Sequence, residues 1–336
     1  MLYEPELMRF QDGSPVLTQD DWARRRSEML DILAREEYGY MPPKRPCKIR
    51  LVDQCNAHYG GHGIEEKLEM TICADKGEFV LPFTLLHPDT REKHPLFLYI
   101  SFSPAIYQKY LPAEVLLQRG YAVAILHYTA ISSDDGDFTN ALAGLMDRPE
   151  DGTGWGKISL WAWTLSLALD ELIRREDIDK DNIAVIGHSR LGKTALWCGG
   201  HDERIRFTCV NDSGCSGAAM ERGKNPESET AEKIYRRFPF WFCENYQAHG
   251  FDVGNMPFDQ HMAIAACCPR YVLVTSASLD TWADPASEER SCIAARPAWE
   301  LFGAQEGVNY FLRDGIHFLS LNDWTYFMDF IDAHRA

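Results

Sequence analysis

Hydrophobic and polar positions divide the chain into a short first part with alternating patterns and a longer second part with continuous apolar runs. Residues 17–40 carry an apolar stripe at helical spacing, which predicts a helix with Thr18 or Asp20 as its cap and with prolines after its end. Three segments with strand composition follow, separated by glycine-containing turns, at residues 47–55, 64–74 and 78–88. This spacing predicts an antiparallel meander.

From residue 95 onward, buried-type strands alternate with helical patterns. The apolar runs lie at residues 95–101, 121–128, 182–187, 206–212, 270–278 and 308–315, and the helical patterns at 112–120, 157–177, 190–200 and 321–334. Such alternation predicts a mostly parallel sheet covered by helices on both faces, which is a three-layer αβα sandwich. We expect an N-terminal helical segment (1–45) packed on one α/β domain (46–336). Residues 131–155 are expected to form a loop, and residues 220–233 an exposed polar excursion.

The charge of the chain excludes several classes of partner. Its 336 residues have a formal net charge of −16, which argues against nucleic acid or an anionic membrane surface as the main partner.

The sequence also predicts the location of the protein and the state of its thiols. No apolar run approaches the length of a membrane span, and no basic and apolar leader precedes the first helix, so a cytoplasmic protein is expected unless a signal was trimmed. The ten cysteines contain no C-x-x-C pair, which argues for reduced thiols and against structural zinc.

The stretch "GHSRLGKT", residues 187–194, satisfies two motifs at once. It fits the phosphate-loop pattern G-x-x-x-x-G-K-[ST], in which Lys193 and Thr194 would contact a nucleotide and its metal ion. It also places Ser189 on a tight turn between an apolar strand and a helix, as in the nucleophile elbow of a serine hydrolase. The motif alone does not distinguish a phosphate loop from a nucleophile elbow.

Position in the chain favours the elbow. Phosphate loops usually follow the first strand of their domain, whereas this motif follows several strands. Downstream, Asp280 and His317 lie on loops after strands, in the order Ser, Asp, His of an α/β-hydrolase. The elbow departs from G-x-S-x-G, because Leu191 occupies the usual glycine position and Gly192 comes one place later. The α/β-hydrolase fold is therefore preferred, and a nucleotide-binding phosphate-loop protein is kept as a distant alternative.

Six further blocks of the sequence carry a resemblance to a known family. They are "WARRRSEMLDILAREEYGYMP", "NDSGCSGAAM", "FPFWFCENY", "MPFDQHMAIAACCPRYVLV", "SASLDTWADP" and "GIHFLSLNDW", in that order along the chain. Together with "GHSRLGKTALW", which resembles the family's G-C-S-R-x-G-K elbow, they are similar to the glucuronoyl esterases, carbohydrate esterase family fifteen, and their bacterial relatives. The resemblance extends from about residue 20 to the end of the chain.

The resemblance implies a role for each residue of the elbow and its partners. Ser189 corresponds to the nucleophile, Arg190 to a residue that helps bind the oxyanion, and His317 to the general base. The family places its acid after either of two strands, so both Asp212 and Asp280 are candidates. Asp280 is preferred, because Asp212 is one methylene shorter than the glutamate usual at its position.

The resemblance also implies a substrate and the residues that bind it. Lys193, Trp282 and Glu229 correspond to the residues that contact the sugar. The expected reaction is hydrolysis of a (4-O-methyl-)glucuronoyl ester of a xylan-derived saccharide without metal or organic cofactor, and sugar O-acetyl ester hydrolysis is the alternative. Three further residues are expected to be structural: His188 and His261 by packing, and Asp284 by capping a helix or turn. The oligomeric state is left open.

Overall fold

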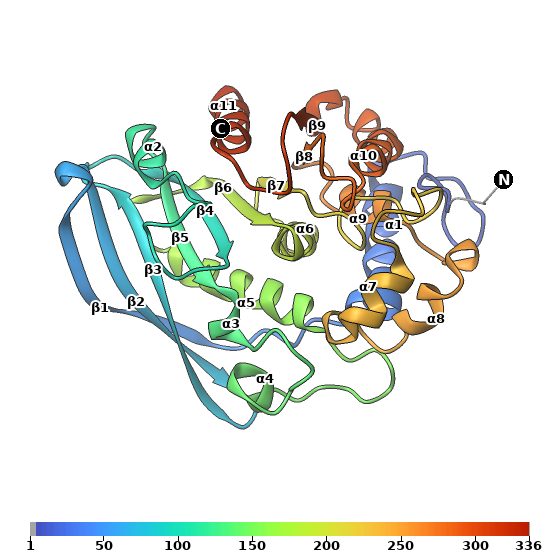
Figure 1. Cartoon of the computed structure of the whole chain (residues 1–336), viewed down its shortest axis with the longest axis horizontal. Coiled ribbons are helices and arrows are strands. Elements are labelled where there is room, and N and C mark those ends of the chain that lie inside the picture. Colours follow the sequence, from blue (N-terminus) through green and yellow to red (C-terminus); the bar gives the residue numbers. More distant parts are fainter. Residues whose placement is uncertain (1–4, 336) are drawn as a thin grey trace.

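One mixed sheet of nine strands runs through the part of the chain that the computed structural model describes, residues 5–335 (Figure 1). Its strands are β1 (Cys47–His58), β2 (Gly63–Ala74), β3 (Gly77–Pro88), β4 (His94–Ser101), β5 (Ala122–His127), β6 (Ile178–His188), β7 (Phe207–Asn211), β8 (Tyr271–Ala277) and β9 (Val308–Arg313). They lie in the order β1-β2-β3-β5-β4-β6-β7-β8-β9, and all pairs from β5 to β9 are parallel. The predicted fold class is confirmed.

Helices connect and cover these strands. They are α1 (Gln19–Leu33), α2 (Ala113–Gln118), α3 (Tyr128–Ile131), α4 (Ala141–Leu145), α5 (Lys157–Leu172), α6 (Arg190–His201), α7 (Ala231–Arg237), α8 (Tyr246–Gly250), α9 (Gln260–Ala265), α10 (Pro285–Glu300) and α11 (Leu321–Ala333). A π-helical turn, η1 (Ala34–Tyr38), extends α1, and short 3-10 turns lie at η2 (Tyr59–Gly61), η3 (Pro239–Trp241), η4 (Val253–Asn255) and η5 (Gln305–Gly307). Within residues 5–335, no helix is both long and apolar enough to cross a lipid bilayer.

The antiparallel meander at the start of the sheet forms as predicted. β2 pairs along its length with β1 and β3, and β3 joins the parallel part by pairing Thr84 with Ile125 of β5. Side chains alternate along β2, so that Leu68, Met70 and Ile72 are buried while Lys67 and Cys73 are exposed. One face of this extension therefore contributes to the core, as the alternation of apolar and polar residues in the sequence predicts.

Two hydrophobic cores lie on opposite faces of the sheet and make the three-layer sandwich. On one face Phe97 and Val123 of the sheet pack with Trp324 and Phe327 of α11. On the other face Leu98 packs in a larger core together with side chains of α1, α5 and α6. Figure 1 shows α2 and α11 on one side of the strands and α5, with the short α3 and α4, on the other.

The N-terminal helix is capped and docked as its sequence indicates. Thr18 accepts a hydrogen bond from the Asp21 N–H, and the Asp21 carboxylate accepts one from the Thr18 N–H, which completes a capping box. Arg26 donates to the carbonyls of Gly200 and Ala266, in α6 and after α9. The proposed boundary at residue 45 stays a prediction.

Two expectations about loops need correction. Residues 131–155 contain the short helix α4, and the segment 220–233 is an exposed excursion only in its middle, since Glu221, Arg222 and Glu229 are buried. The terminal nitrogens of Arg222 have partners inside the protein, because they donate to the Phe258 and Met256 carbonyls and pair with Asp259. Polar composition predicted exposure, but partners distant in the sequence make burial possible.

Candidate active site

A polar cavity of about 190 Å³ opens at the carboxyl ends of the parallel strands. Its lining residues are Ser189, Arg190, Lys193, Asp212, Ser213, Gly214, Glu229, Arg237, Phe238, Trp241, Trp282, Ala283 and His317. Ser189 follows β6, Asp212 follows β7, Asp280 follows β8 and His317 follows β9. Loops at this edge of a parallel sheet are where α/β proteins place their sites, so the predicted residues are brought together.

Ser189 occupies a strained turn between β6 and α6. Its backbone angles, φ of 58° and ψ of −127°, lie in a region that residues other than glycine rarely adopt. Its N–H donates to the Asn211 carbonyl at 2.9 Å. A Cβ on Gly187 would lie 1.9 Å from the Leu191 carbonyl oxygen, so only glycine fits there. These features match a nucleophile elbow, which presents a serine hydroxyl at the edge of the sheet.

The unusual spacing of the second elbow glycine has a packing explanation. Leu191 occupies the position that is usually glycine. Its side chain is fully buried in the larger core and packs α6 against it. Gly192 faces the loop after β7 instead, where a Cβ would lie 3.0 Å from the Ser213 Cβ and 3.2 Å from the Asn211 carbonyl oxygen. The close approach of α6 to that loop therefore needs the glycine one residue later.

His317 and Asp280 form a hydrogen-bonded pair. The His317 Nδ1 lies 2.5 Å from Asp280 Oδ2, so the carboxylate accepts the Nδ1 proton and leaves Nε2 of the neutral ring able to accept another. Burial disfavours the charged ring, but the hydrogen bond and the negative charge of Asp280 outweigh it, and the pKa of His317 is raised above its ordinary value. This is the arrangement of a general base oriented by an acid.

Asp212, the other candidate acid, contacts the loop of His317. Its Oδ1 accepts the Ala277 N–H at 2.8 Å, and its Oδ2 accepts the Phe318 N–H at 3.2 Å and an Arg313 N–H at 3.3 Å. Burial, followed by the nearby carboxylates of Glu288 and Asp280, raises the pKa of Asp212 to about 8. Asp212 therefore supports the backbone on both sides of the site, whereas Asp280 holds the ring of His317.

The histidine next to the serine is held in a different network. The His188 Nδ1 lies 2.6 Å from the Asn211 Oδ1, and the ring centroid lies 4.6 Å from that of His317. Burial and the adjacent His317 lower the pKa of His188 to about 3, so this ring is neutral at physiological pH. The expectation that it packs in the interior is confirmed. His261 is likewise buried, within 3.0 Å of the Pro5 carbonyl, and Asp284 caps α10.

The threonine that a phosphate loop would use is engaged within its own helix, and the lysine is held against the loop after β7. Lys193 is 3% exposed and donates to the Ser213 carbonyl oxygen, and the Thr194 hydroxyl donates to the Arg190 carbonyl oxygen within its own helix. A phosphate loop needs its lysine and threonine to face a nucleotide and a metal ion. The nucleotide-binding alternative therefore has no support in the geometry of this turn.

One side of the cavity offers groups suited to sugar hydroxyls. The Lys193 ammonium lies 3.8 Å from Glu229 Oε2, which pairs a donor with an acceptor at the wall. Trp282 is 44% exposed, and its backbone carbonyl accepts the Glu229 N–H at 2.9 Å, so the tryptophan and the glutamate are fixed to each other. An exposed aromatic face beside polar groups is a suitable surface for a pyranose ring.

Sequence reasoning missed part of the lining. Arg237 and Phe238, at the end of α7, and Trp241 line the same cavity, and the Phe238 and Trp241 rings stack with centroids 3.9 Å apart. The block "FPFWFCENY" contains two of these residues and marks the segment, but nothing in it indicates which rings line the cavity.

The acid and base residues could also be considered as metal ligands. One atom each of Asp212, Asp280 and His317 lie within 4.8 Å of one another. Asp280 Oδ2 is occupied by the His317 N–H, and Asp212 Oδ2 faces the Arg313 guanidinium, which already supplies positive charge. The cluster therefore has the chemistry of a hydrogen-bond network around a base.

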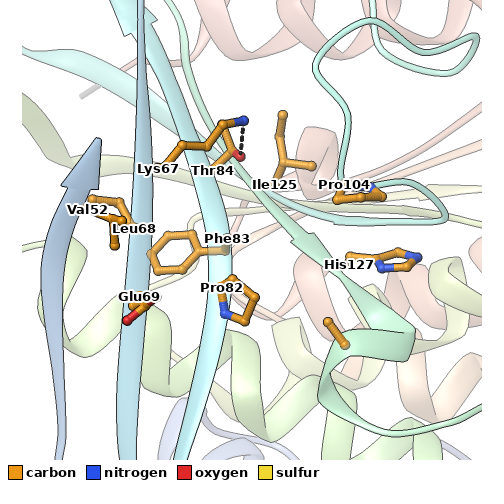
Figure 2. Close-up of a pocket in the computed structure, with 11 residues that line it drawn as sticks. Val52, Lys67, Leu68, Glu69, Pro82, Phe83, Thr84, Pro104, Ile125 and His127 are labelled. Atoms are coloured by element: carbon orange, nitrogen blue, oxygen red, sulfur yellow. Dashed lines mark hydrogen bonds between the residues drawn. The ribbon is translucent and has the colours of Figure 1, made fainter. Parts of the chain in front are cut away.

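A larger cavity of about 350 Å³ lies elsewhere, between the meander and the end of β5 (Figure 2). Val52, Leu68 and Phe83 line one side of it and Pro104 and His127 the other. Its lining includes neither a serine nor a cysteine, so hydrolytic chemistry is assigned to the polar cavity.

Solved structures of other proteins have the same fold. A promiscuous carbohydrate esterase family 15 esterase from a marine bacterial metagenome superimposes with a TM-score of 0.90 at 27% identity, covering 99% of this chain and 97% of that chain. The glucuronoyl esterase from Solibacter usitatus superimposes with a TM-score of 0.89 at 28% identity, covering 99% and 98%. In sequence, the 4-O-methyl-glucuronoyl methylesterase of Phanerochaete carnosa is 25% identical, over 93% of this chain and 75% of that protein.

The elbow, the acid–histidine pair and the strand order define the class as α/β-hydrolase. The family model described as glucuronyl esterase, fungi, matches residues 92–303, which is more than half of the chain. The chain belongs to the glucuronyl esterase family, a family of carbohydrate esterases, and the resemblance inferred from its motifs is confirmed.

Proposed function

We propose that this enzyme hydrolyses glucuronoyl esters, including 4-O-methyl-glucuronoyl esters of xylan-derived saccharides, through an acyl-enzyme on Ser189. The observation that carries the proposal is the Asp280–His317 pair beside the elbow serine, in a cavity whose other wall presents Lys193, Glu229 and Trp282. The family of the chain and the names of its relatives support the same ester class.

The reaction follows from the roles that these groups can take. His317 Nε2 removes the proton of Ser189 Oγ as that oxygen attacks the ester carbonyl, and Asp280 stabilises the imidazolium that forms. Arg190 lies beside the developing oxyanion and stabilises its charge. His317 returns the proton to the alcohol, which leaves as the carbon–oxygen bond of the ester breaks. Water, activated by the same base, then releases the uronic acid from Ser189.

The size and the polarity of the cavity favour a sugar acid over an acetyl group. A volume of about 190 Å³ is below the roughly 300–1,000 Å³ of pockets that enclose drug-sized ligands, so it suits one sugar unit. An acetyl group would leave Lys193 and Glu229 without ligand partners and would gain nothing from Trp282. A cytoplasmic location stays a prediction from the sequence.

A panel of esters tests the proposed specificity. We expect the methyl ester of glucuronic acid to be hydrolysed with a kcat/KM at least about 100-fold above that of acetylated xylo-oligosaccharides. The acyl half of an acetyl ester has no hydroxyls, and a site built to hydrogen-bond the hydroxyls of the acyl group rejects one that lacks them. Initial rates of acid release measure both. The methyl ester of galacturonic acid is a matched control for recognition of the sugar. Faster release of acetate than of glucuronate would replace the proposal with a sugar O-acetyl esterase.

A further inference from the structure

Asp134, in the loop after α3, accepts hydrogen bonds on both oxygens of its carboxylate. Its Oδ2 pairs with the Arg190 guanidinium and accepts the Tyr128 hydroxyl at 3.1 Å, and its Oδ1 accepts the Trp241 indole N–H at 2.7 Å. The side chain is only 13% exposed. One carboxylate thus joins three segments: the elbow helix α6, the short helix α3 and the η3 turn that carries Trp241.

The Arg190 side chain is confined on its other sides by aromatic rings. Its guanidinium carbon lies 4.8 Å from the Trp241 ring centroid and 5.3 Å from that of Phe238. One of its terminal nitrogens, Nη1, is bound to Asp134, and its Nε is buried without a hydrogen-bond partner among the described residues. The carboxylate and the two rings therefore fix the orientation of the guanidinium at the wall of the cavity, which Arg190 lines.

The loop that carries Asp134 is itself anchored to the core. Lys157, fully buried at the start of α5, donates to the Ser132 hydroxyl and to the Asp137 carbonyl oxygen, the latter at 2.7 Å. These bonds tie residues on both sides of Asp134 to α5. A charged side chain mounted on an anchored loop makes a rigid support for the group that it binds.

We propose that Asp134 is a positioning residue for the esterase reaction, which holds the Arg190 guanidinium in the orientation that stabilises the oxyanion on the substrate carbonyl. The inference rests on the proposed function and on the role of Arg190 in it. The negative charge of Asp134 weakens the positive field of Arg190, so the benefit comes from orientation. An arginine side chain that is free to rotate must lose that freedom during the reaction, whereas one that Asp134 already holds has lost it on folding.

A double-mutant cycle tests this proposal. Asp134→Asn keeps an oxygen that can accept the Trp241 N–H but removes the charge that pairs with Arg190. We expect it to lower kcat about 10- to 100-fold with KM changed less than about threefold, since the interaction acts in the transition state. In an Arg190→Ala background the same substitution is expected to cost less than about threefold, because the residue through which it acts is already gone.

Two further variants distinguish a loss of activity that acts through Arg190 from one caused by a damaged fold. Tyr128→Phe removes one donor to Asp134 without changing the ring, and we expect a loss of kcat of a few-fold in the wild-type background and none with Arg190→Ala. Asp135→Asn, in the same loop and bonded to the Ser133 hydroxyl, is the matched control and should leave kcat and KM unchanged.

Equal losses from Asp134→Asn in both backgrounds would overturn the inference, and so would a normal kcat with Arg190→Ala or with Asp134→Asn. Failure of the proposed function gives a different result, because the wild-type enzyme would then not hydrolyse glucuronate esters. In that case the cycle is measured on whichever ester the panel identifies.

Discussion

Replacing His317 with alanine is expected to lower kcat by about 10⁵- to 10⁶-fold, which is the order of loss seen when the base of a serine hydrolase is removed. Without the imidazole, Ser189 keeps its proton at neutral pH and the leaving alcohol receives none. Stopped initial-rate assays on the methyl ester of glucuronic acid measure the loss. KM should change little, because His317 acts on the reacting atoms and not on the sugar.

Added imidazole provides a check on this result. The His317 side chain is 40% exposed and lines an open cavity, so a small base can enter the space left by the ring. We expect imidazole to restore part of the activity of His317→Ala. The exposed His62 is a control position, where alanine should leave kcat unchanged. A His317→Ala enzyme that retains a tenth or so of its activity would show that another base acts.

Replacing Asp280 with asparagine is expected to lower kcat about 10⁴-fold, whereas Asp212→Asn should lower it less than about tenfold. Asp280 accepts the Nδ1 proton of His317, and an amide in its place allows the wrong tautomer and removes the charge that stabilises the imidazolium. Asp212 accepts backbone N–H groups and pairs with Arg313, whereas the Nδ1 proton of His317 is held by Asp280, so loss of the Asp212 charge affects the base less.

The pH profile provides a second measurement of the same assignment. The base is active when His317 is unprotonated, so kcat/KM rises as the pH increases through the pKa of His317, which Asp280 raises above the ordinary histidine value. Loss of Asp280 removes the larger cause of that raised pKa, and loss of the Asp212 charge removes a smaller one, so the rise should move to lower pH in Asp280→Asn and move less in Asp212→Asn. A larger loss of kcat in Asp212→Asn, or a shift in that variant alone, would reverse the assignment of the acid.

The fold could be predicted from the sequence because its strands have clear patterns of apolar residues. Apolar runs such as residues 95–101 and 182–187 became the central strands β4 and β6, and the alternation in 64–74 became β2. The order of Ser189, Asp280 and His317 predicted their meeting at one edge, since the carboxyl ends of parallel strands share it. The periodicity of a strand and the order of residues along the chain can both be read from a single sequence.

What could not be predicted depends on side-chain direction and on contacts between distant segments. Asp212 and Asp280 both follow strands, and only the structure shows that Asp280 contacts the ring while Asp212 contacts the backbone. The burial of Arg222 depends on Asp259, 37 residues away. The pairing of Arg190 with Asp134 spans 56 residues, and no local pattern indicates it.

The role of Ser189 as the nucleophile of a glucuronoyl esterase is tested by the rates at which the wild-type enzyme and Ser189→Ala release glucuronate from its methyl ester, measured side by side. We expect ready turnover by the wild-type enzyme and a loss of about 10⁶-fold in kcat for the variant, with the fold unchanged by circular dichroism. Undiminished release of glucuronate by Ser189→Ala would show that another group is the nucleophile.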